Sequence, residues 1–181
     1  RRLRQQFFQL QSHRDQLQYQ ATHDALTGLY NRKHFNDQLQ VLPNLTCPAN
    51  TGVIAFDIDG FKVINDSHGH AAGDFLLQEI ARRLRATQTS HEVQYRMGGD
   101  EFTLIFSNIK SEQDLIDRAH VLIQQCNVPI VLNERTIELM LSIGVTYQQK
   151  AVNTIPELCS AADIALYHVK SQGGNDVVLY R

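Results

Sequence analysis

Tryptophan is absent from this 181-residue chain, and cysteine, methionine and proline are scarce, with 3, 2 and 4 residues respectively. The cysteines, Cys47, Cys126 and Cys159, are odd in number and far apart in the sequence. This spacing excludes a disulfide framework and a cysteine-based metal site. A reducing compartment is the simplest interpretation, and we expect the chain to be cytoplasmic.

Long apolar runs and an excess of either charge are also missing. No segment approaches the roughly 20 apolar residues needed to cross a bilayer, and the polar amino terminus is not that of a signal peptide. The formal net charge of −2 gives no basic field for a nucleic-acid backbone. We therefore expect no nucleic-acid partner and no membrane contact by this segment. Because the chain lacks an initial methionine, we expect a fragment of a longer protein, whose inner-membrane anchor, if present, would leave this part on the cytoplasmic side.

The chain does have the composition of one globular domain, with 43% hydrophobic and 20% charged residues. Residues 1–22 differ from the rest, being rich in Gln and Arg without Gly or Pro. Spacings of four and three alternate along a seam of Leu3, Phe7, Leu10, Arg14, Leu17 and Ala21. Such a helix either packs on its own domain or pairs with a partner chain as a signalling helix. We therefore divide the chain into a helix at 1–22 and a domain at 23–181.

Helical and strand patterns alternate beyond residue 24. We expect helices at 31–42, 71–85, 111–125 and 156–171, and strands at 52–58, 93–97, 102–106, 128–132, 136–147 and 176–180. Residues 43–50 are expected to form a loop. The helix at 111 begins with a capping-type Ser-x-x-Asp, and Gly173-Gly174 is expected to end the last helix. This order predicts an α+β fold, a mostly antiparallel central sheet flanked by helices.

A turn between two predicted strands contains Gly98 and Gly99, followed directly by Asp100 and Glu101. Glycine permits positive φ and lets a bulky ligand approach the main chain. Two adjacent acids repel each other unless a cation lies between them. The combination suits a metal-bound polyphosphate.

Several ordered segments carry a family resemblance from about residue 24 to about residue 175. They are residues 24–32 (DALTGLYNR), 57–66 (DIDGFKVIND) with Gly69-His70 and Gly73-Asp74, 98–102 (GGDEF), 142–145 (SIGV), and 162–167 (ADIALY) with Lys170. In these motifs the chain resembles the GGDEF domain of diguanylate cyclases. The resemblance implies the palm-like nucleotidyl cyclase fold.

Metal ligands are implied at the end of the first predicted strand of the domain. An acid such as Asp57 at the end of a buried strand needs a partner, which could be a helix cap, a salt bridge or a metal ion. In the family, the positions of Asp57, the Ile58 carbonyl, Asp100 and Glu101 share two metal ions. Magnesium prefers oxygen ligands, so we expect two Mg²⁺ per site, with Mn²⁺ as a substitute. Either Asp100 or Glu101 serves as the base.

Substrate contacts are implied on both sides of Gly69. Asn65 and Asp74 are nine positions apart, about 900° of helix and so on opposite faces, unless the chain breaks at Gly69. With that break, both could read guanine, since an acid accepts from two guanine N–H groups; otherwise they cap two short helices. The remaining substrate or catalytic residues implied are Phe61, Lys62, His70, Gly98, Gly99 and Lys170. Lys62 would stabilise transition-state charge, or is simply solvated, and Lys170 would reach a phosphate or complement a helix dipole.

Two positions depart from the family pattern. Gly174 stands where the family often has Arg or Lys, so we expect a weaker hold on phosphate. Many members carry an Arg-x-x-Asp motif that binds product and inhibits the enzyme. Here residues 89–92 are Thr-Ser-His-Glu, with no arginine to grip phosphate. Inhibition by product through that site is expected to be absent.

The resemblance implies a diguanylate cyclase that condenses two GTP into cyclic di-GMP and releases two pyrophosphates. One domain offers one GTP site, so catalysis needs a homodimer, and the full-length chain is expected to carry an upstream sensory domain. One alternative is a catalytically silent GTP-binding regulatory module, against which the intact acids and Lys62 argue. A class III-type cyclase making a cyclic mononucleotide is another, against which the GGDEF run and the guanine-reading pair argue.

Overall fold

The computed structural model of this protein describes residues 2–41, 45–132 and 134–181. The helices are α1 (Arg2–Thr22), α2 (Arg32–Val41), α3 (Phe61–His68), α4 (His70–Ala86), α5 (Glu112–Cys126) and α6 (Ile155–Ser171). The strands are β1 (Tyr30–Asn31), β2 (Thr51–Ile58), β3 (Glu92–Gly98), β4 (Glu101–Phe106), β5 (Ile130–Leu132), β6 (Arg135–Ile137), β7 (Leu141–Gln148) and β8 (Val177–Leu179).

One six-stranded sheet organises the domain, in the order β1-β3-β4-β2-β7-β8. Its four inner strands pair antiparallel, and the two short edge strands β1 and β8 pair parallel to their neighbours. Strands β5 and β6 form a separate hairpin. The expected α+β fold with a mostly antiparallel sheet is therefore confirmed.

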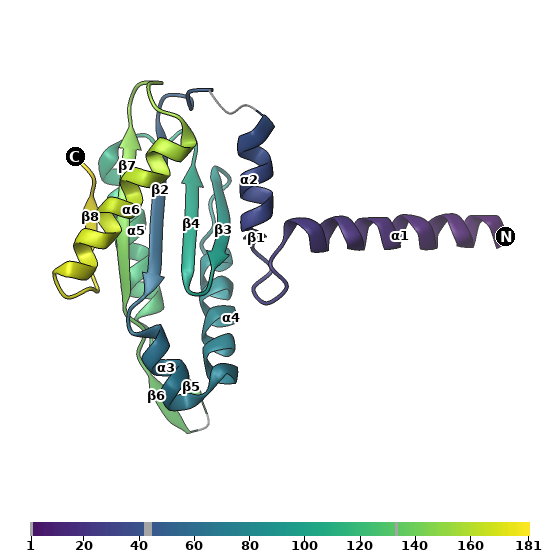
Figure 1. The fold of residues 1–181 in the computed structure, drawn as a ribbon, viewed down its shortest axis with the longest axis horizontal. Coiled ribbons are helices and arrows are strands. Elements are labelled where there is room, and N and C mark those ends of the chain that lie inside the picture. Colours follow the sequence, from purple (N-terminus) through teal and green to yellow (C-terminus); the bar gives the residue numbers. More distant parts are fainter. Residues whose placement is uncertain (1, 42–44, 133) are drawn as a thin grey trace.

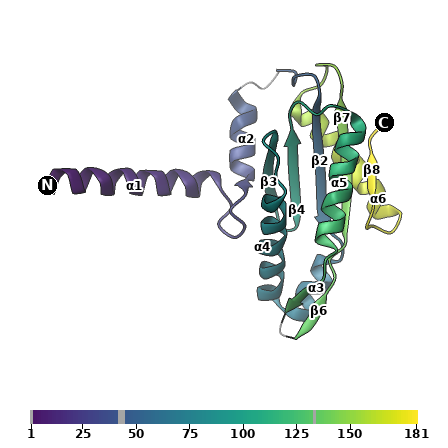
Figure 2. The ribbon, with the colours of Figure 1, turned by 180° about the vertical axis from the view of Figure 1, so that it is seen from behind.

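Helices cover both faces of this sheet. Figure 1 shows α6 and α2 on one face, with β2 and β4 between them, and Figure 2 shows α4 and α5 on the other. Alternation along β2 serves both faces: Ile54, Phe56 and Ile58 belong to the large core, and Val53 and Ala55 to a smaller core with residues of α6. By the same alternation, Asp57, two positions after Ala55, belongs to the α6 face.

Helix α6 lies unusually close to β7. A Cβ atom on Gly144 would lie 2.0 Å from the Ala162 carbonyl oxygen and 2.4 Å from the Leu166 nitrogen. Only glycine allows this approach of two backbones. The short separation brings the carboxyl-terminal half of α6 over the end of β2.

The structure differs from the expected elements in a few places. The strand expected at 136–147 is divided: β6 ends at Ile137 and β7 begins at Leu141. Leu139 and Leu141 are both buried, and the Met140 carbonyl accepts from the Asp59 amide. The chain thus leaves the small hairpin to enter the central sheet. Periodicity could not show this change, because apolar residues alternate without a break through Ile137, Leu139, Leu141 and Ile143.

Strand β1 was not predicted, and no bounds were given for α3, the helix before the expected break at Gly69. The strand expected at 128–132 begins only at Ile130. The loop expected at 43–50 is confirmed for 45–50, whereas 43 and 44 lie outside the described residues. The Ser111 hydroxyl accepts from the Asp114 amide, which confirms the predicted cap of α5.

Helix α1 extends away from the domain (Figures 1 and 2). Of its apolar side chains, Phe7 is 60% exposed, Leu10 70% and Leu17 52%. The interpretation in which this seam packs on its own domain is therefore wrong for the side chains from residue 4 onward. In the described part of the chain, no helix combines the length and apolarity that crossing a bilayer requires.

Candidate active site at the end of strand β2

Asp57 is the most deeply buried acid of the site, with 3% of its surface exposed. Its Oδ2 forms an ion pair with Lys170 Nζ from α6, so the salt bridge considered from the sequence is present. Within the described residues, Oδ1 is buried without a hydrogen-bond partner. Burial raises the pKa of Asp57, the Lys170 ammonium opposes this, and the carboxylates of Asp100 and Asp59 raise it further. A buried acceptor left unpaired is costly, and a cation is the partner that would satisfy it.

The ion pair with Asp57 also shifts the pKa of Lys170. Burial acts to lower the pKa of this ammonium, but its hydrogen bond and attraction to Asp57 outweigh burial and raise it. Lys170 therefore stays charged in the neutral range. Its position in the last turn of α6, over Asp57, is consistent with a contact to a bound phosphate.

The turn between β3 and β4 presents the other two acids. Gly98 and Gly99 have φ of 144° and 52°, conformations that favour glycine. Asp100 is half-buried and Glu101 is exposed. Because Phe102 of β4 pairs with Phe56 of β2, the following residue of β2, Asp57, lies beside Glu101 at the end of the strands.

A cavity of about 510 Å³ opens at this point, between α2 and α6. Asp57, Glu101 and Lys170 line it together with Asp163 of α6. Burial raises the pKa of Asp163, and the nearby Glu101 carboxylate raises it further. Asp163 was not assigned a role from the sequence. It lies within the ADIALY motif, and an acidic residue directly after Ala162 in that motif was the signal that could have identified it.

The residues present fit a divalent metal ion. The unpaired Oδ1 of Asp57 is a hard oxygen ligand with Asp100 and Glu101 nearby, which is the chemistry that Mg²⁺ prefers. In the described ranges, however, no three His, Cys, Asp or Glu side chains already converge as a metal cage. Substrate phosphates commonly complete such a shell.

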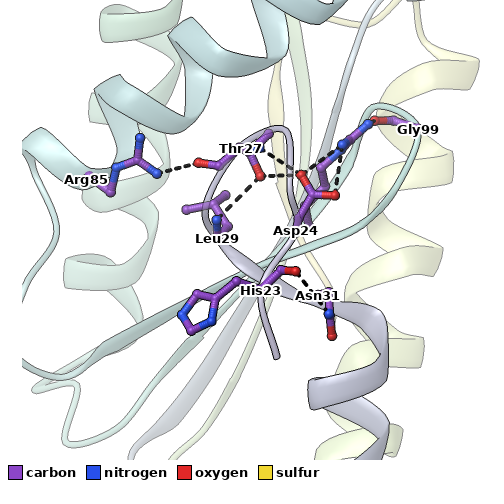
Figure 3. A network of polar contacts seen from close by, with 8 residues as sticks. His23, Asp24, Thr27, Leu29, Asn31, Arg85 and Gly99 are labelled. Carbon is purple, nitrogen blue, oxygen red and sulfur yellow. Dashed lines mark hydrogen bonds and ion pairs between the residues drawn. The ribbon is translucent and has the colours of Figure 1, made fainter. Parts of the chain in front are cut away.

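Arg96 of β3 connects the glycine turn to Asp24. Its Nε and Nη2 donate to the Gly99 carbonyl at 3.0 and 2.8 Å, and its Nη1 donates to both Asp24 oxygens at 3.1 and 2.9 Å. Figure 3 shows this network, in which Asp24 also accepts from the Thr27 amide and hydroxyl at 2.9 and 2.7 Å. Burial acts to raise the pKa of Asp24, but its bonds to Thr27 and Arg96 lower it overall. Asp24 opens the first of the segments that resemble the family, and neither Asp24 nor Arg96 was assigned a role from the sequence.

The expected break between α3 and α4 occurs at Gly69, whose φ is 87°. A Cβ atom on Gly73 would lie 1.9 Å from Asn65 Oδ1 and 3.1 Å from the Phe61 ring. Asn65 and Phe61 therefore pack against Gly73, directly before Asp74. Gly69 is the N-cap residue of α4, and no side chain forms a cap hydrogen bond there. Capping α4 therefore does not explain Asp74. Lys62 and His70 are exposed on the same two helices.

Gly174, the first departure from the family pattern, has a structural reason. Its φ is 78°, and a Cβ atom there would lie 2.6 Å from Asp59 Oδ2. Asp59 itself accepts from the Ser142 hydroxyl at 2.6 Å and the Asn175 amide at 2.7 Å. A side chain at 174 would require the Asp59 carboxylate to move and would strain the backbone at this positive φ.

Glu92 stands where the Arg-x-x-Asp motif of the family has its aspartate. Its side chain points into the protein. Its carboxylate accepts from Arg118 Nη2 at 2.9 Å and Nε at 3.1 Å, and from Gln94 Nε2 at 2.7 Å. The side chain of Glu92 has no exposed surface. It is therefore engaged in the interior rather than available to a ligand.

Known proteins similar to this chain include diguanylate cyclases. Diguanylate cyclase DgcN of Escherichia coli is 35% identical over 173 residues, 93% of this chain and 42% of the relative. MucR of Pseudomonas aeruginosa, described as a bifunctional diguanylate cyclase/cyclic di-GMP phosphodiesterase, is 35% identical over 157 residues, 86% of this chain and 23% of the relative. The chain thus spans less than half the length of these curated relatives.

Solved structures agree with this similarity. The coiled coil and GGDEF domain of DgcB from Caulobacter crescentus, in complex with c-di-GMP, matches with a TM-score of 0.85 and 25% identity over 96% of this chain and 93% of that one. The GGDEF domain of PA1120 (TpbB or YfiN) from P. aeruginosa matches with a TM-score of 0.77 and 32% identity, covering 88% and 94%. Residues 21–176 match the family described as "Diguanylate cyclase, GGDEF domain". With the acids, the glycine turn and the split helix pair in their expected places, this chain belongs to the GGDEF domain family of diguanylate cyclases.

Proposed function

We propose that this domain condenses two GTP molecules into cyclic di-GMP, with one GTP bound per domain. The observation that carries the proposal is the buried Asp57 with its unpaired Oδ1, beside a glycine turn that presents Asp100 and Glu101. The names of the relatives, which are diguanylate cyclases, support this activity.

The GTP would lie across the end of β2. Asn65 and Asp74 would receive the guanine edge, since Asn65 packs on Gly73 directly beside Asp74. Lys62, Lys170 and the main chain at Gly98 and Gly99 would receive the phosphates. Phe61 and His70 lie on the two helices that border this path.

The reaction joins two nucleotides held on two domains. The 3′-oxygen of one GTP forms a bond to the α-phosphorus of the other, the bond to the pyrophosphate oxygen breaks, and Asp100 or Glu101 accepts the hydroxyl proton. A second, identical step closes the ring and releases the second pyrophosphate. Holding both reactants on folded domains can replace about 7–11 kcal/mol of association entropy and solvent reorganisation.

Two Mg²⁺, for which Mn²⁺ could substitute, would be held by Asp57, the Ile58 carbonyl, Asp100 and Glu101. These ions would supply the positive charge that stabilises the developing oxyanions. Lys170 would add a further positive charge, although it must share its ammonium with Asp57.

Catalysis would require a homodimer, because one domain offers one GTP site. The exposed apolar seam of α1 is a surface through which two chains can pair. An upstream sensory domain, and a cytoplasmic location of this domain, complete the proposal.

The test incubates the purified chain with GTP and Mg²⁺ and resolves the nucleotides by chromatography. Cyclic di-GMP and pyrophosphate in a one-to-two ratio are expected, and Asp57→Asn should abolish both. Binding of GTP without any product would favour the silent regulatory module, and a cyclic mononucleotide would favour a class III-type reaction.

A further inference from the structure

The turn that carries Asp100 and Glu101 is held from outside itself. The backbone has positive φ at Gly98 and Gly99. A register shift between Arg96 and Gly98 interrupts the β3–β4 ladder before its last pair, Gly98 with Glu101. The Gly99 carbonyl is held by two N–H groups of the Arg96 side chain. That side chain is only 13% exposed. Its bonds to Asp24 are partly buried, whereas its bonds to the Gly99 carbonyl lie at the exposed end of the hairpin.

Arg96 takes its own position from the loop that follows α1. The Nη1 group of Arg96 donates to both carboxylate oxygens of Asp24. The loop is closed by main-chain bonds from the Asp24 amide to the Leu29 carbonyl at 2.7 Å and from the Gly28 amide to the Asp24 carbonyl at 2.8 Å. Arg85 of α4 donates to the Thr27 carbonyl at 2.5 Å and fixes the loop to the domain (Figure 3).

The same loop is attached to the end of α1. Asn31 Oδ1 accepts from the His34 amide at 2.7 Å and so caps α2. Its Nδ2 donates to the carbonyls of Ala21 and His23 at 3.1 and 3.2 Å. One amide side chain thus joins the start of α2 to the end of α1.

A row of aromatic rings provides a second attachment. Tyr19 of α1 stacks on His23 with a centroid distance of 3.8 Å, and His23 lies 4.6 Å from Tyr30. Tyr30 in turn lies 5.7 Å from Tyr95, the residue of β3 directly before Arg96. The row therefore runs from α1 to the strand that leads into the catalytic turn.

We propose that Arg96 and Asp24 are positioning residues of the catalytic turn, and that Asn31 connects them to α1. The tilt of α1 would then set the position of Asp100 and Glu101 inside a single domain, in addition to bringing two domains together. This inference rests on the proposed function for the role of the two acids. Its structural part, the dependence of the turn on Arg96 and Asn31, is independent of any activity.

Arginine suits this role because its planar fork binds two partners in fixed directions. Lysine keeps the charge but offers a single point of contact. Arg96→Lys should therefore keep an ion pair with Asp24 and release the Gly99 carbonyl. Arg118→Lys is the matched control, because Arg118 also forks onto a carboxylate from β3, at 11% exposure, but away from the turn.

The experiment measures amide hydrogen exchange of the full chain without nucleotide. Exchange at residues 98–101 should accelerate at least about tenfold in Arg96→Lys and stay unchanged in Arg118→Lys, even where both variants lose thermal stability. Equal exchange at 98–101 in the wild type and Arg96→Lys would overturn the proposal.

Asn31→Asp tests the connection to α1. Aspartate still caps α2 but cannot donate to the carbonyls of Ala21 and His23. Exchange at 98–101 should again accelerate, and a spin-label distance from α1 to α5 should broaden. Unchanged exchange at 98–101 in this variant would contradict the link to α1.

A metal readout completes the design. Mn²⁺ binding in the presence of a non-hydrolysable GTP analogue, followed by electron paramagnetic resonance, should weaken about tenfold in Arg96→Lys and not in Arg118→Lys. Mn²⁺ bound with equal affinity in all three proteins would contradict the positioning role. If the wild type makes no cyclic di-GMP but the exchange results hold, only the proposed function fails.

Discussion

Asp57 and Glu101 line one cavity but meet water differently: Asp57 is almost fully buried and Glu101 is exposed. The exposed acid is the one that can exchange protons with a bound hydroxyl or with solvent. The buried acid is held in place by Lys170 and is suited to a fixed ligand role.

Glu101→Gln should abolish synthesis of cyclic di-GMP while the domain stays folded and still binds GTP weakly. The amide has nearly the same shape but cannot carry the negative charge that a metal or a proton transfer requires, so a loss of about 10²–10⁴-fold is expected. Turnover measured by chromatography, with circular dichroism as the folding control, checks this. Synthesis at the wild-type rate would remove Glu101 from the site.

Asp74→Ser should weaken GTP and admit ATP. The carboxylate beside Asn65 is the group expected to accept from guanine, and its loss should cost about 1–3 kcal/mol of binding. Competition of GTP and ATP for the site measures the change, with the exposed Asp117→Ser on α5 as a control. An unchanged ratio of GTP to ATP turnover would mean that Asp74 does not read the base.

Glu79 on α4 illustrates a purely structural acid. Hydrogen bonds from Arg82, opposed by burial and assisted by Arg83, lower its pKa from 4.5 to about 2. Because the folded pKa lies below the unfolded one, the stabilisation is complete above about pH 4.5 and is lost as the pH falls toward 2.

Glu79→Gln should therefore be less stable than the wild type at pH 7, with a difference that shrinks between pH 4.5 and about 2. Urea unfolding at several pH values measures the difference. A gap that stays constant across this window would show that the ion pairs with Arg82 and Arg83 contribute nothing to it.

At the scale of elements, α1 carries an apolar seam that no other described part of the chain covers. Leu17→Glu should lower the dimer fraction and the activity at low protein concentration, and activity should return as concentration rises. The reason is that a buried charge at a seam position opposes pairing, while the domain core is untouched.

The neighbouring Gln16→Glu adds the same charge outside the seam and serves as its control. Analytical ultracentrifugation and specific activity against concentration are the measurements. Equal sedimentation of the two variants and the wild type would argue against pairing through α1.

At the scale of the whole molecule, the domain should lack feedback by its product at a separate site. Glu92 is enclosed with Arg118, and residues 89–91 offer no arginine. Initial rates against added cyclic di-GMP at several GTP concentrations should show at most competitive inhibition. Strong noncompetitive inhibition, or product bound tightly by the GTP-saturated domain, would reveal a second site.

Much of this structure could be predicted from local patterns in the sequence. The glycine turn, the buried strand ending in Asp57 and the helix break at Gly69 each depend on a few neighbouring residues, and all three were predicted. The division of the strand at 138–140 was not, because it depends on where Leu139 and Leu141 find the core.

Contacts between positions far apart in the chain could not be predicted from the sequence. Asp24 and Arg96 are 72 positions apart and meet only once the hairpin is placed beside the loop after α1. Likewise, the pairing of Lys170 with Asp57 requires the close approach of α6 to β7 at Gly144. A single sequence gives no measure of such distances, so Asp24 and Arg96 received no role, and the salt bridge considered for Asp57 had no named partner.

The sheet has very short outer strands: β1 has two residues and β8 three, whereas the inner β2 and β7 have eight each. Unpaired N–H and C=O groups on a long outer strand invite edge-to-edge polymerisation. Here the strands most capable of templating such growth are enclosed on both sides. We therefore expect the folded domain to resist fibril formation, so that aggregation on heating would report loss of the sheet itself.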